Sequence, residues 1–252
     1  MEKYIDINEE GCSVRCKLYY EDLHTVRRAV LFGHGFGGHK DNKAAEKFAR
    51  YVLSKYKNLA VMTFDWPCHG ADARKKLSLE DCNTYLRLCT RWLRERLGAE
   101  ELYAYATSFG GYLFLKYISE SENPFRRLAF RCPAVNMYDV ITGAIMQEED
   151  LAKVEKGKDI LVGFDRKIKI SRDFLQEVKA ADITLRDFSD FCGEILILQG
   201  TKDEIVPFAA VEAFADQNLL DFEAVENADH RFIDPKIMER AIIRIADFFD
   251  LR

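Results

Sequence analysis

Tyr103 to Gly111 reads YAYATSFGG, a run that joins an apolar segment typical of a buried strand to a glycine pair that opens a helical pattern. Ser108 lies at the junction. A sharp turn from strand to helix holds its central residue in a strained backbone conformation, with the side chain near the positive end of the helix. Ala106 and the two glycines are small enough to let this turn close. The run therefore predicts a nucleophilic serine, although an ordinary turn with an incidental serine has the same local pattern.

The position of the histidines favours the first interpretation. A nucleophilic serine on a parallel sheet needs a base, and the chain order in such proteins is serine, acid, histidine. His230 is the only one of five histidines that follows Ser108. It lies between the strand-like residues 222–226 and a helical pattern that begins near Pro235. This places it on a loop at the carboxyl edge of the sheet, where ligands bind, and predicts that His230 is the base.

An acid at the same edge is predicted by the run EILILQ at residues 194–199, which is followed by GTKDEIVP at residues 200–207. Asp203 lies in this turn after a buried strand. A carboxylate bonded to one imidazole nitrogen fixes the tautomer that leaves the other nitrogen free to accept the serine proton. Glu204 is an alternative, but we expect it to point the other way. A structural role for Asp203 as a turn former remains open.

A glycine-rich turn at residues 33–38, GHGFGG, follows another buried strand. Glycines let backbone N–H groups approach an anion, so we predict that the N–H groups of Phe36 and Phe109 form an oxyanion hole. The turn also fits the dinucleotide pattern GxGxxG. That site needs an acidic residue at a strand end about 20 residues later, whereas residues 49–57 read as the end of a helix. We therefore expect no nucleotide and no other cofactor.

The whole chain alternates between strand-like and helical runs, which predicts an α/β fold with one mostly parallel sheet of eight strands flanked by helices. The first two runs have no helix between them and predict an antiparallel hairpin. A long helix is expected from Leu79 to Leu97, with Ser78 as its cap. The predicted strands are residues 3–7, 12–20, 28–32, 59–64, 101–106, 128–131, 194–199 and 222–225.

The interval of residues 136–185 departs from this alternation of strand-like and helical runs. It leaves the carboxyl edge of the sheet and returns to it, so we predict a cap insertion over the serine, with residues 1–135 and 186–252 forming the core. Two short runs at residues 159–164 and 167–171 predict a hairpin inside it. The charged residues 147–158 are expected to form a solvated helix.

Composition excludes several classes of protein. The chain has 252 residues, 48% of them hydrophobic, which suffices for one packed domain. With 37 basic and 42 acidic residues the net charge is −5, so neither nucleic acid nor an anionic membrane surface is an expected partner. No run approaches the ~18 apolar residues of a membrane span, and the first residues lack a signal core. We expect a cytoplasmic protein.

The seven cysteines lack the spacing of metal ligands, so we predict no metal site. Several of them, including Cys16, Cys132 and Cys192, lie in or beside apolar runs. We therefore expect reduced thiols in the core.

Taken together, five motifs in this order resemble the α/β-hydrolase family. They are HGFGG at residues 34–38, DWPCHG at 65–70, SFGG at 108–111, GTKDEIVP at 200–207 and ADHRF at 228–232. Within the family the chain is similar to small cinnamoyl or feruloyl esterases and to monoglyceride lipases. Two positions depart from the pattern, because Ala106 replaces the first elbow glycine and Thr107 stands where these relatives often carry histidine.

The resemblance implies a serine carboxylesterase that cleaves a small-molecule ester, with hydroxycinnamoyl or short acyl groups as candidates. Tyr138 and Phe164 in the predicted cap are candidates for stacking on an aromatic acyl group, or for simple packing inside the cap. Acyl transfer to another acceptor, and cleavage of thioesters or peptides, would use the same residues. A ligand-binding receptor that retains the triad is the alternative outside the enzymes, and the oligomeric state is not predicted.

Overall fold

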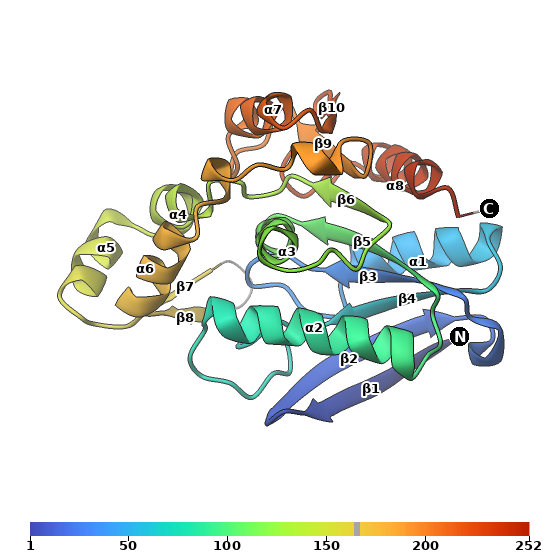
Figure 1. Cartoon of the computed structure of the whole chain (residues 1–252). Helices are drawn as coiled ribbons and strands as arrows, with labels where there is room; N and C mark the ends of the chain where they lie inside the picture. The colour runs from blue at the N-terminus through green and yellow to red at the C-terminus, as the bar shows by residue number, and fades with distance from the viewer. Residues whose placement is uncertain (164–166, 252) are drawn as a thin grey trace.

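The predicted strands form one eight-stranded sheet in a computed structural model that describes residues 1–163 and 167–251 (Figure 1). Its strands are β1 (Glu2–Glu9), β2 (Cys12–Tyr20), β3 (Arg28–Gly33), β4 (Leu59–Phe64), β5 (Glu101–Thr107), β6 (Arg127–Arg131), β9 (Ile195–Gly200) and β10 (Asp221–Val225). The spatial order is β1-β2-β4-β3-β5-β6-β9-β10. Strand β2 pairs antiparallel with both β1 and β4, and the other pairs are parallel. The predicted hairpin and mostly parallel sheet are confirmed.

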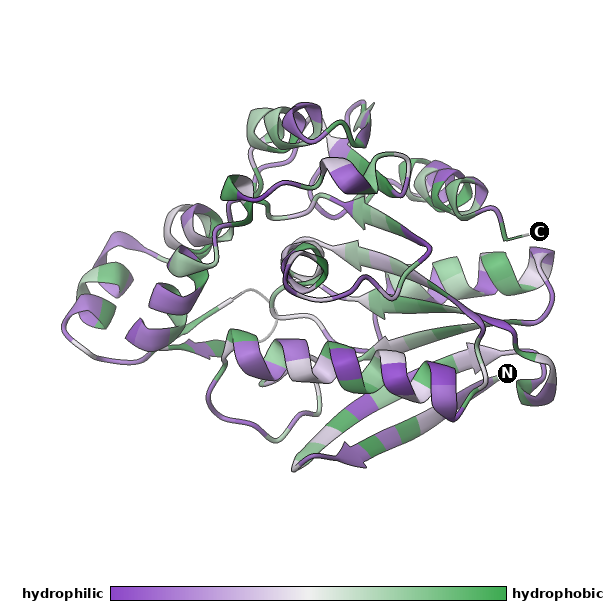
Figure 2. Cartoon of the chain, viewed as in Figure 1, coloured by the Kyte–Doolittle hydropathy of each residue, from purple (hydrophilic) through white to green (hydrophobic). Residues whose placement is uncertain are grey.

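Helices cover both faces of the sheet, which explains why the central strands carry runs of consecutive apolar residues rather than apolar residues at alternate positions. In β3, for example, Val30 and Phe32 belong to one buried cluster and Ala29 and Leu31 to the other. Figure 2 shows mostly hydrophobic central strands between helices whose colours alternate along their length, as do the colours of β1 and β2. The first face carries α1 (Lys43–Lys55) and α8 (Pro235–Phe249), and the second carries α2 (Leu79–Glu95), α3 (Phe109–Glu120) and α7 (Phe208–Gln217).

Local signals in the sequence set the helix ends. The Ser78 hydroxyl accepts a hydrogen bond from the Asp81 N–H at 3.2 Å, so the predicted cap of α2 is confirmed. Helix α8 begins with Pro235 after the capping side chain of Asp234, and its C-terminal cap Asp250 has φ of 50°. These caps fix where the connecting loops leave each helix.

Residues 136–185 form a set of short elements that gather at one end of the molecule, away from both termini (Figure 1). The predicted hairpin is confirmed, with β7 and β8 antiparallel and Ile160 opposite Ile170. The elements of this interval and the turn after it are α4 (Met137–Asp139), the π-helical turn η2 (Val140–Ile145), α5 (Glu148–Glu155), β7 (Ile160–Val162), β8 (Ile168–Ile170), α6 (Arg172–Ala180), and the 3₁₀ turns η3 (Ile183–Leu185) and η4 (Ser189–Phe191). One further 3₁₀ turn, η1 (Leu23–Thr25), precedes β3.

This interval packs against α2 and α3, the helices on the second face of the sheet. The Glu177 carboxylate accepts the N–H of Leu79 at 2.8 Å, and the Tyr112 hydroxyl donates to the carbonyl of Ala181 at 3.0 Å. Its buried side chains, such as Phe174, belong to the same apolar cluster as α2 and α3. The interval therefore shares its core with the rest of the chain.

The cysteines are free thiols, and six of the seven are buried. The expectation of a core position is wrong for Cys192, which is exposed. It follows the 3₁₀ turn η4, and Gly193 with φ of 76° then reverses the chain before β9 begins. The apolar run beside Cys192 thus starts only after this turn.

Every helix within residues 1–163 and 167–251 is too short or too polar to cross a membrane.

Candidate functional site

Ser108 lies at the turn between β5 and α3 with φ of 53° and ψ of −120°, a strained conformation that few residues other than glycine adopt. Its N–H donates to the Arg131 carbonyl at 3.1 Å, and its carbonyl accepts the Ala134 N–H at 3.2 Å. Ala106 is fully buried in β5, so its methyl group fits the turn. The sequence prediction of a tight strand-to-helix turn at this serine is confirmed.

The two glycines after Ser108 are needed because the first turn of α3 packs directly on neighbouring backbone. A Cβ at Gly110 would lie 2.6 Å from the carbonyl oxygen of Gly33, and one at Gly111 would lie 2.7 Å from Pro133 Cβ. Both distances are too short for a real side chain. Gly110 thus lets the start of α3 approach the end of β3, and Gly111 lets it approach the segment after β6.

Asp203 and His230 are in direct contact at the carboxyl edge of β9 and β10. The Nδ1 atom of His230 lies 2.9 and 3.0 Å from the two carboxylate oxygens of Asp203. The Asp203 side chain is fully buried, whereas that of His230 is 13% exposed. Because an ionised carboxylate can only accept, Nδ1 carries the proton in this pair and Nε2 is left as an acceptor.

The surroundings of Asp203 keep it ionised. One oxygen accepts the N–H groups of Ile205 and Val206 at 2.9 and 2.8 Å, and the other accepts the Gln199 amide at 2.9 Å. Burial by itself raises the pKa of Asp203, but the hydrogen bond from His230 and the two backbone N–H groups bring it below the ordinary value. A buried negative charge beside the imidazole is the result.

Glu204, the neighbouring acid, makes a different contact. Its carboxylate accepts the backbone N–H of His230 at 3.4 Å. It therefore touches the backbone of the histidine loop, while Asp203 holds the ring.

Cys132, which sequence reasoning did not place in the site, lies beside this pair. Its thiol, the Asp203 carboxylate and a ring nitrogen of His230 lie within 4.8 Å of one another. Burial and the nearby Asp203 charge raise the pKa of the Cys132 thiol well above its ordinary value. Metal ligation requires the thiolate, so these three groups suit a hydrogen-bonded pair beside a neutral thiol better than a metal ion. The available signal was the position of Cys132 directly after a predicted strand.

The glycine-rich turn after β3 lies against Ser108. A Cβ on Gly35 would stand 3.2 Å from Ser108 Cβ, and the Phe36 ring packs edge-on against Phe109 with 5.6 Å between centroids. Among the described residues, the N–H groups of Phe36 and Phe109 and the Ser108 hydroxyl have no hydrogen-bond partner. The turn after β3 and the start of α3 thus meet at Ser108.

Two buried side chains support that turn from the next loop. The Asp65 carboxylate accepts the Lys40 N–H at 2.6 Å and the Ala71 N–H at 2.8 Å, and it pairs with the Lys40 ammonium at 3.1 Å. The backbone carbonyl of His34 accepts the indole N–H of Trp66 at 2.9 Å. The motifs HGFGG and DWPCHG are therefore joined in space, although only the first had been assigned a role.

His34 is held in its neutral form. Its ring is buried, and burial lowers the pKa to about 3, although the hydrogen bond to the Gly35 carbonyl opposes this effect. His34 therefore carries no charge near the expected oxyanion.

The two residues expected to contact the acyl group have different outcomes. Tyr138 on α4 is half-buried, and the Lys179 ammonium lies 5.2 Å from the centroid of its ring. Stacking on an acyl group and packing inside the cap both stay predictions for Tyr138. Phe164 lies outside the described residues.

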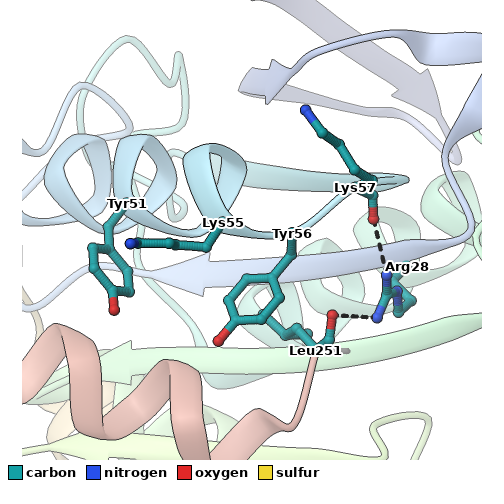
Figure 3. Close-up of a pocket in the computed structure, with 6 residues that line it drawn as sticks. All are labelled: Arg28, Tyr51, Lys55, Tyr56, Lys57 and Leu251. Atoms are coloured by element: carbon teal, nitrogen blue, oxygen red, sulfur yellow. Dashed lines mark hydrogen bonds between the residues drawn. The ribbon is translucent and has the colours of Figure 1, made fainter.

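The hollow in Figure 3 lies elsewhere, at the amino end of β3. It has a volume of about 560 Å³ and is lined by α1, the segment that follows it and Leu251. Arg28 at its base donates to the carbonyls of Leu251 and Lys57. Because Ser108 lies at the carboxyl end of β5, the hollow and the candidate site are at opposite edges of the sheet.

Comparisons with known proteins agree with this geometry. The family model described as "alpha/beta hydrolase fold" matches residues 28–157. A search of curated proteins finds no match to the sequence.

Solved structures match over nearly the full length of the chain. Est1E from Butyrivibrio proteoclasticus with bound ferulic acid has a TM-score of 0.74 at 17% identity, covering 98% of this chain and 99% of that one. A putative hydrolase from Agrobacterium vitis S4 has a TM-score of 0.79 at 15% identity, covering 99% and 98%. A soluble variant of monoglyceride lipase from Saccharomyces cerevisiae, in complex with a substrate analogue, has a TM-score of 0.74 at 14% identity, covering 99% and 94%. At these low identities, the structural matches show a common fold and nothing further.

Proposed function

Because this chain belongs to the α/β-hydrolase family, we propose that it is a serine carboxylesterase in which Ser108, His230 and Asp203 are the catalytic residues. The observation that carries the proposal is the contact of His230 Nδ1 with both oxygens of Asp203, at the sheet edge where Ser108 has its strained conformation. Serine, acid and histidine follow in the chain order of this fold.

The proposed reaction proceeds in two halves. His230 Nε2 accepts the proton of the Ser108 hydroxyl as its oxygen attacks the ester carbonyl, and the Phe36 and Phe109 N–H groups stabilise the oxyanion. The histidine then gives the proton to the leaving alkoxide, so an alcohol departs and an acyl-serine remains. Water attacks this intermediate by the same path, which releases the acid and restores the hydroxyl.

The substrate class is proposed from the segment that adjoins the site. We assign residues 136–185 as a cap over Ser108, with residues 1–135 and 186–252 as the core. Est1E binds ferulic acid, and this likeness supports hydroxycinnamoyl or short-acyl esters as candidate substrates. We propose that Tyr138, which lies in the described part of this cap, contacts the acyl group.

A serine-directed fluorophosphonate probe tests the chemistry independently of the substrate. We expect the wild type to be labelled and to hydrolyse members of a panel of p-nitrophenyl esters of graded length and methyl hydroxycinnamates. Ser108→Ala should fold normally, lose labelling, and lose kcat by ~10⁴-fold or more. The exposed Ser54 offers a matched control, because Ser54→Ala removes the same hydroxyl far from the site.

Three results would separate the proposal from its alternatives. Labelling of Ser108→Ala at the wild-type rate would remove Ser108 as the nucleophile. Labelling of the wild type without turnover of any ester would point to a receptor or to another acyl acceptor. Turnover of thioesters or peptides in preference to esters would change the reaction class.

A further inference from the structure

Gln199, the residue before the end of β9, has a fully buried side chain that points at the acid of the proposed triad. Its amide nitrogen donates to Asp203 Oδ2 at 2.9 Å and to the Val206 carbonyl at 3.3 Å. An ionised carboxylate and a carbonyl can only accept, so both contacts require the NH₂ group. The orientation of the amide is thereby fixed.

This orientation leaves the other end of the amide without a partner. Within residues 1–163 and 167–251, Gln199 Oε1 is buried and accepts no hydrogen bond. Buried polar atoms are almost always paired, because removing them from water is costly. A side chain of similar size without the oxygen would avoid this cost. The contacts of the amide with the Asp203 carboxylate and the Val206 carbonyl must therefore offset the cost of the unpaired oxygen.

The partners of the two Asp203 oxygens differ in kind. The Oδ1 atom accepts two backbone N–H groups, which are present with any side chain at position 199, and it lies 3.0 Å from His230 Nδ1. The Oδ2 atom accepts the Gln199 amide and lies 2.9 Å from His230 Nδ1, and the Cys132 thiol lies close to the same carboxylate. The amide thus holds the oxygen that the two backbone N–H groups do not bind, so that together these donors keep both oxygens turned towards the imidazole.

We infer that Gln199 is a positioning residue for the Asp203–His230 pair, an inference that rests on the proposed function. It directs Oδ2 towards His230 Nδ1 and helps to keep Asp203 ionised, and it does not touch the substrate. The amide neither gains nor loses a proton in the reaction.

The first test is Gln199→Leu, which removes the donor and the unpaired oxygen together. Loss of one hydrogen bond to a charged group should lower kcat by ~10- to 100-fold. The KM should stay near the wild-type value, because Gln199 lies behind the acid. The melting temperature should change by no more than about 4 °C, since removal of the unpaired oxygen offsets part of the loss of the bonds to Asp203 and the Val206 carbonyl. Gln217→Leu on α7 is the matched control at an exposed glutamine and should leave both quantities unchanged.

The second test is Gln199→Glu, which is nearly isosteric and gives a pH signature. A buried carboxyl beside the Asp203 carboxylate has a raised pKa, because two adjacent negative charges repel. While protonated, its O–H can replace the amide as the donor to Oδ2, so kcat/KM should approach the wild-type value. When it ionises, it repels Asp203. The pH profile of kcat/KM should therefore gain a descending limb at a pH where the wild type is on its plateau.

Four outcomes decide the inference. Wild-type kcat in a folded Gln199→Leu protein overturns it, as does a Gln199→Glu profile that matches the wild type at every pH. A large fall in melting temperature of both variants, with activity lost only in proportion to the unfolded fraction, assigns Gln199 a purely structural role. Loss of kcat with a retained melting temperature, together with the new limb, supports it. Full activity of Ser108→Ala overturns the proposed function instead, so the two failures are distinguishable.

Discussion

Asp203 shows how a buried carboxylate is kept charged by contacts a few residues away. Its pKa is lowered in the folded protein, so its contribution to stability is present above the unfolded pKa and is lost as the pH falls through the folded value. The turn GTKDEIVP supplies two of its donors through the N–H groups of Ile205 and Val206. The same turn therefore sets both the place of the acid and its ionisation.

The two neighbouring acids should respond differently to removal of their charge. Asp203→Asn should lower kcat by roughly 10³- to 10⁴-fold, because an amide at this position favours the wrong histidine tautomer. Glu204→Gln should lower it by less than about tenfold, because Glu204 contacts only the backbone of the histidine loop. Steady-state kinetics on one p-nitrophenyl ester makes the comparison, with circular dichroism to verify folding. The opposite ranking would move the role of the acid to Glu204.

His34 predicts a pH dependence of stability. Its pKa in the folded protein is about 3, against an ordinary value of 6.5, so the unfolded chain takes up a proton that the folded protein refuses. The free energy of unfolding should fall below pH about 6.5, with a slope that approaches about 1.4 kcal/mol per pH unit from this group. Above that pH the contribution should be constant.

Urea unfolding at pH values from 7.5 down to about 5, above the range in which most carboxylates titrate, measures this slope. His34→Gln should flatten the curve, while His24→Gln, at an exposed histidine, should leave it as in the wild type. An unchanged slope in His34→Gln would show that another group takes up the proton.

At the scale of the elements, the close approach of α3 to β3 depends on Gly110. A Cβ there would meet two backbone oxygens, those of Gly33 and His34, at 2.6 and 2.8 Å. Backbone cannot move aside as a flexible side chain can. Gly110→Ala should therefore destabilise the protein by ~1–3 kcal/mol and lower kcat as well, because the shift displaces the Phe36 and Phe109 N–H groups.

Gly143 provides the matched control for this substitution. A Cβ there would meet nothing within 4 Å, so Gly143→Ala should change the free energy of unfolding by less than about 1 kcal/mol. Chemical unfolding measures the stability of both variants, and turnover of p-nitrophenyl acetate measures the effect on the site. Equal stability of the two variants would mean that α3 can shift without cost.

The proposed cap should affect selectivity more than chemistry. Tyr138→Ala should lower kcat/KM for methyl ferulate by about tenfold and that for p-nitrophenyl acetate by no more than about twofold, because remote contacts orient only the larger acyl group. Lys179→Met is the control, since it removes the cation over the ring but keeps the ring itself. Equal losses of folded Tyr138→Ala on both esters would indicate support of the catalytic geometry rather than contact with substrate.

At the scale of the whole molecule, patterns that repeat along the chain predicted more than single residues did. Each predicted strand begins and ends within two residues of the observed strand, because apolar runs between turn residues are a strong signal. The contact of Asp203 with His230 also agrees with the sequence, since both follow parallel strands and such strands end at one edge.

Contacts between distant segments could not be predicted in this way. Gln199, Cys132 and the Asp65–Lys40 pair reach the site through side-chain directions that depend on strand order and loop shape. The exposed Cys192 shows the reverse error, because an apolar neighbourhood in sequence says little about a residue in a tight turn. Pairing across the sheet has to be known before such contacts can be assigned.

The shared core of residues 136–185 with α2 and α3 bears on how such a protein can be re-engineered or can diverge. An insertion with its own core could be exchanged between relatives as a module joined at two points. Here α2 and α3 contribute to the apolar cluster in which this interval packs, and Tyr112 and Leu79 bond directly to residues of the interval. A chimera that transplants only residues 136–185 would set foreign side chains against a mismatched surface. The smallest unit that can be exchanged therefore includes the facing residues of both helices, so new specificities should arise here through coupled substitutions.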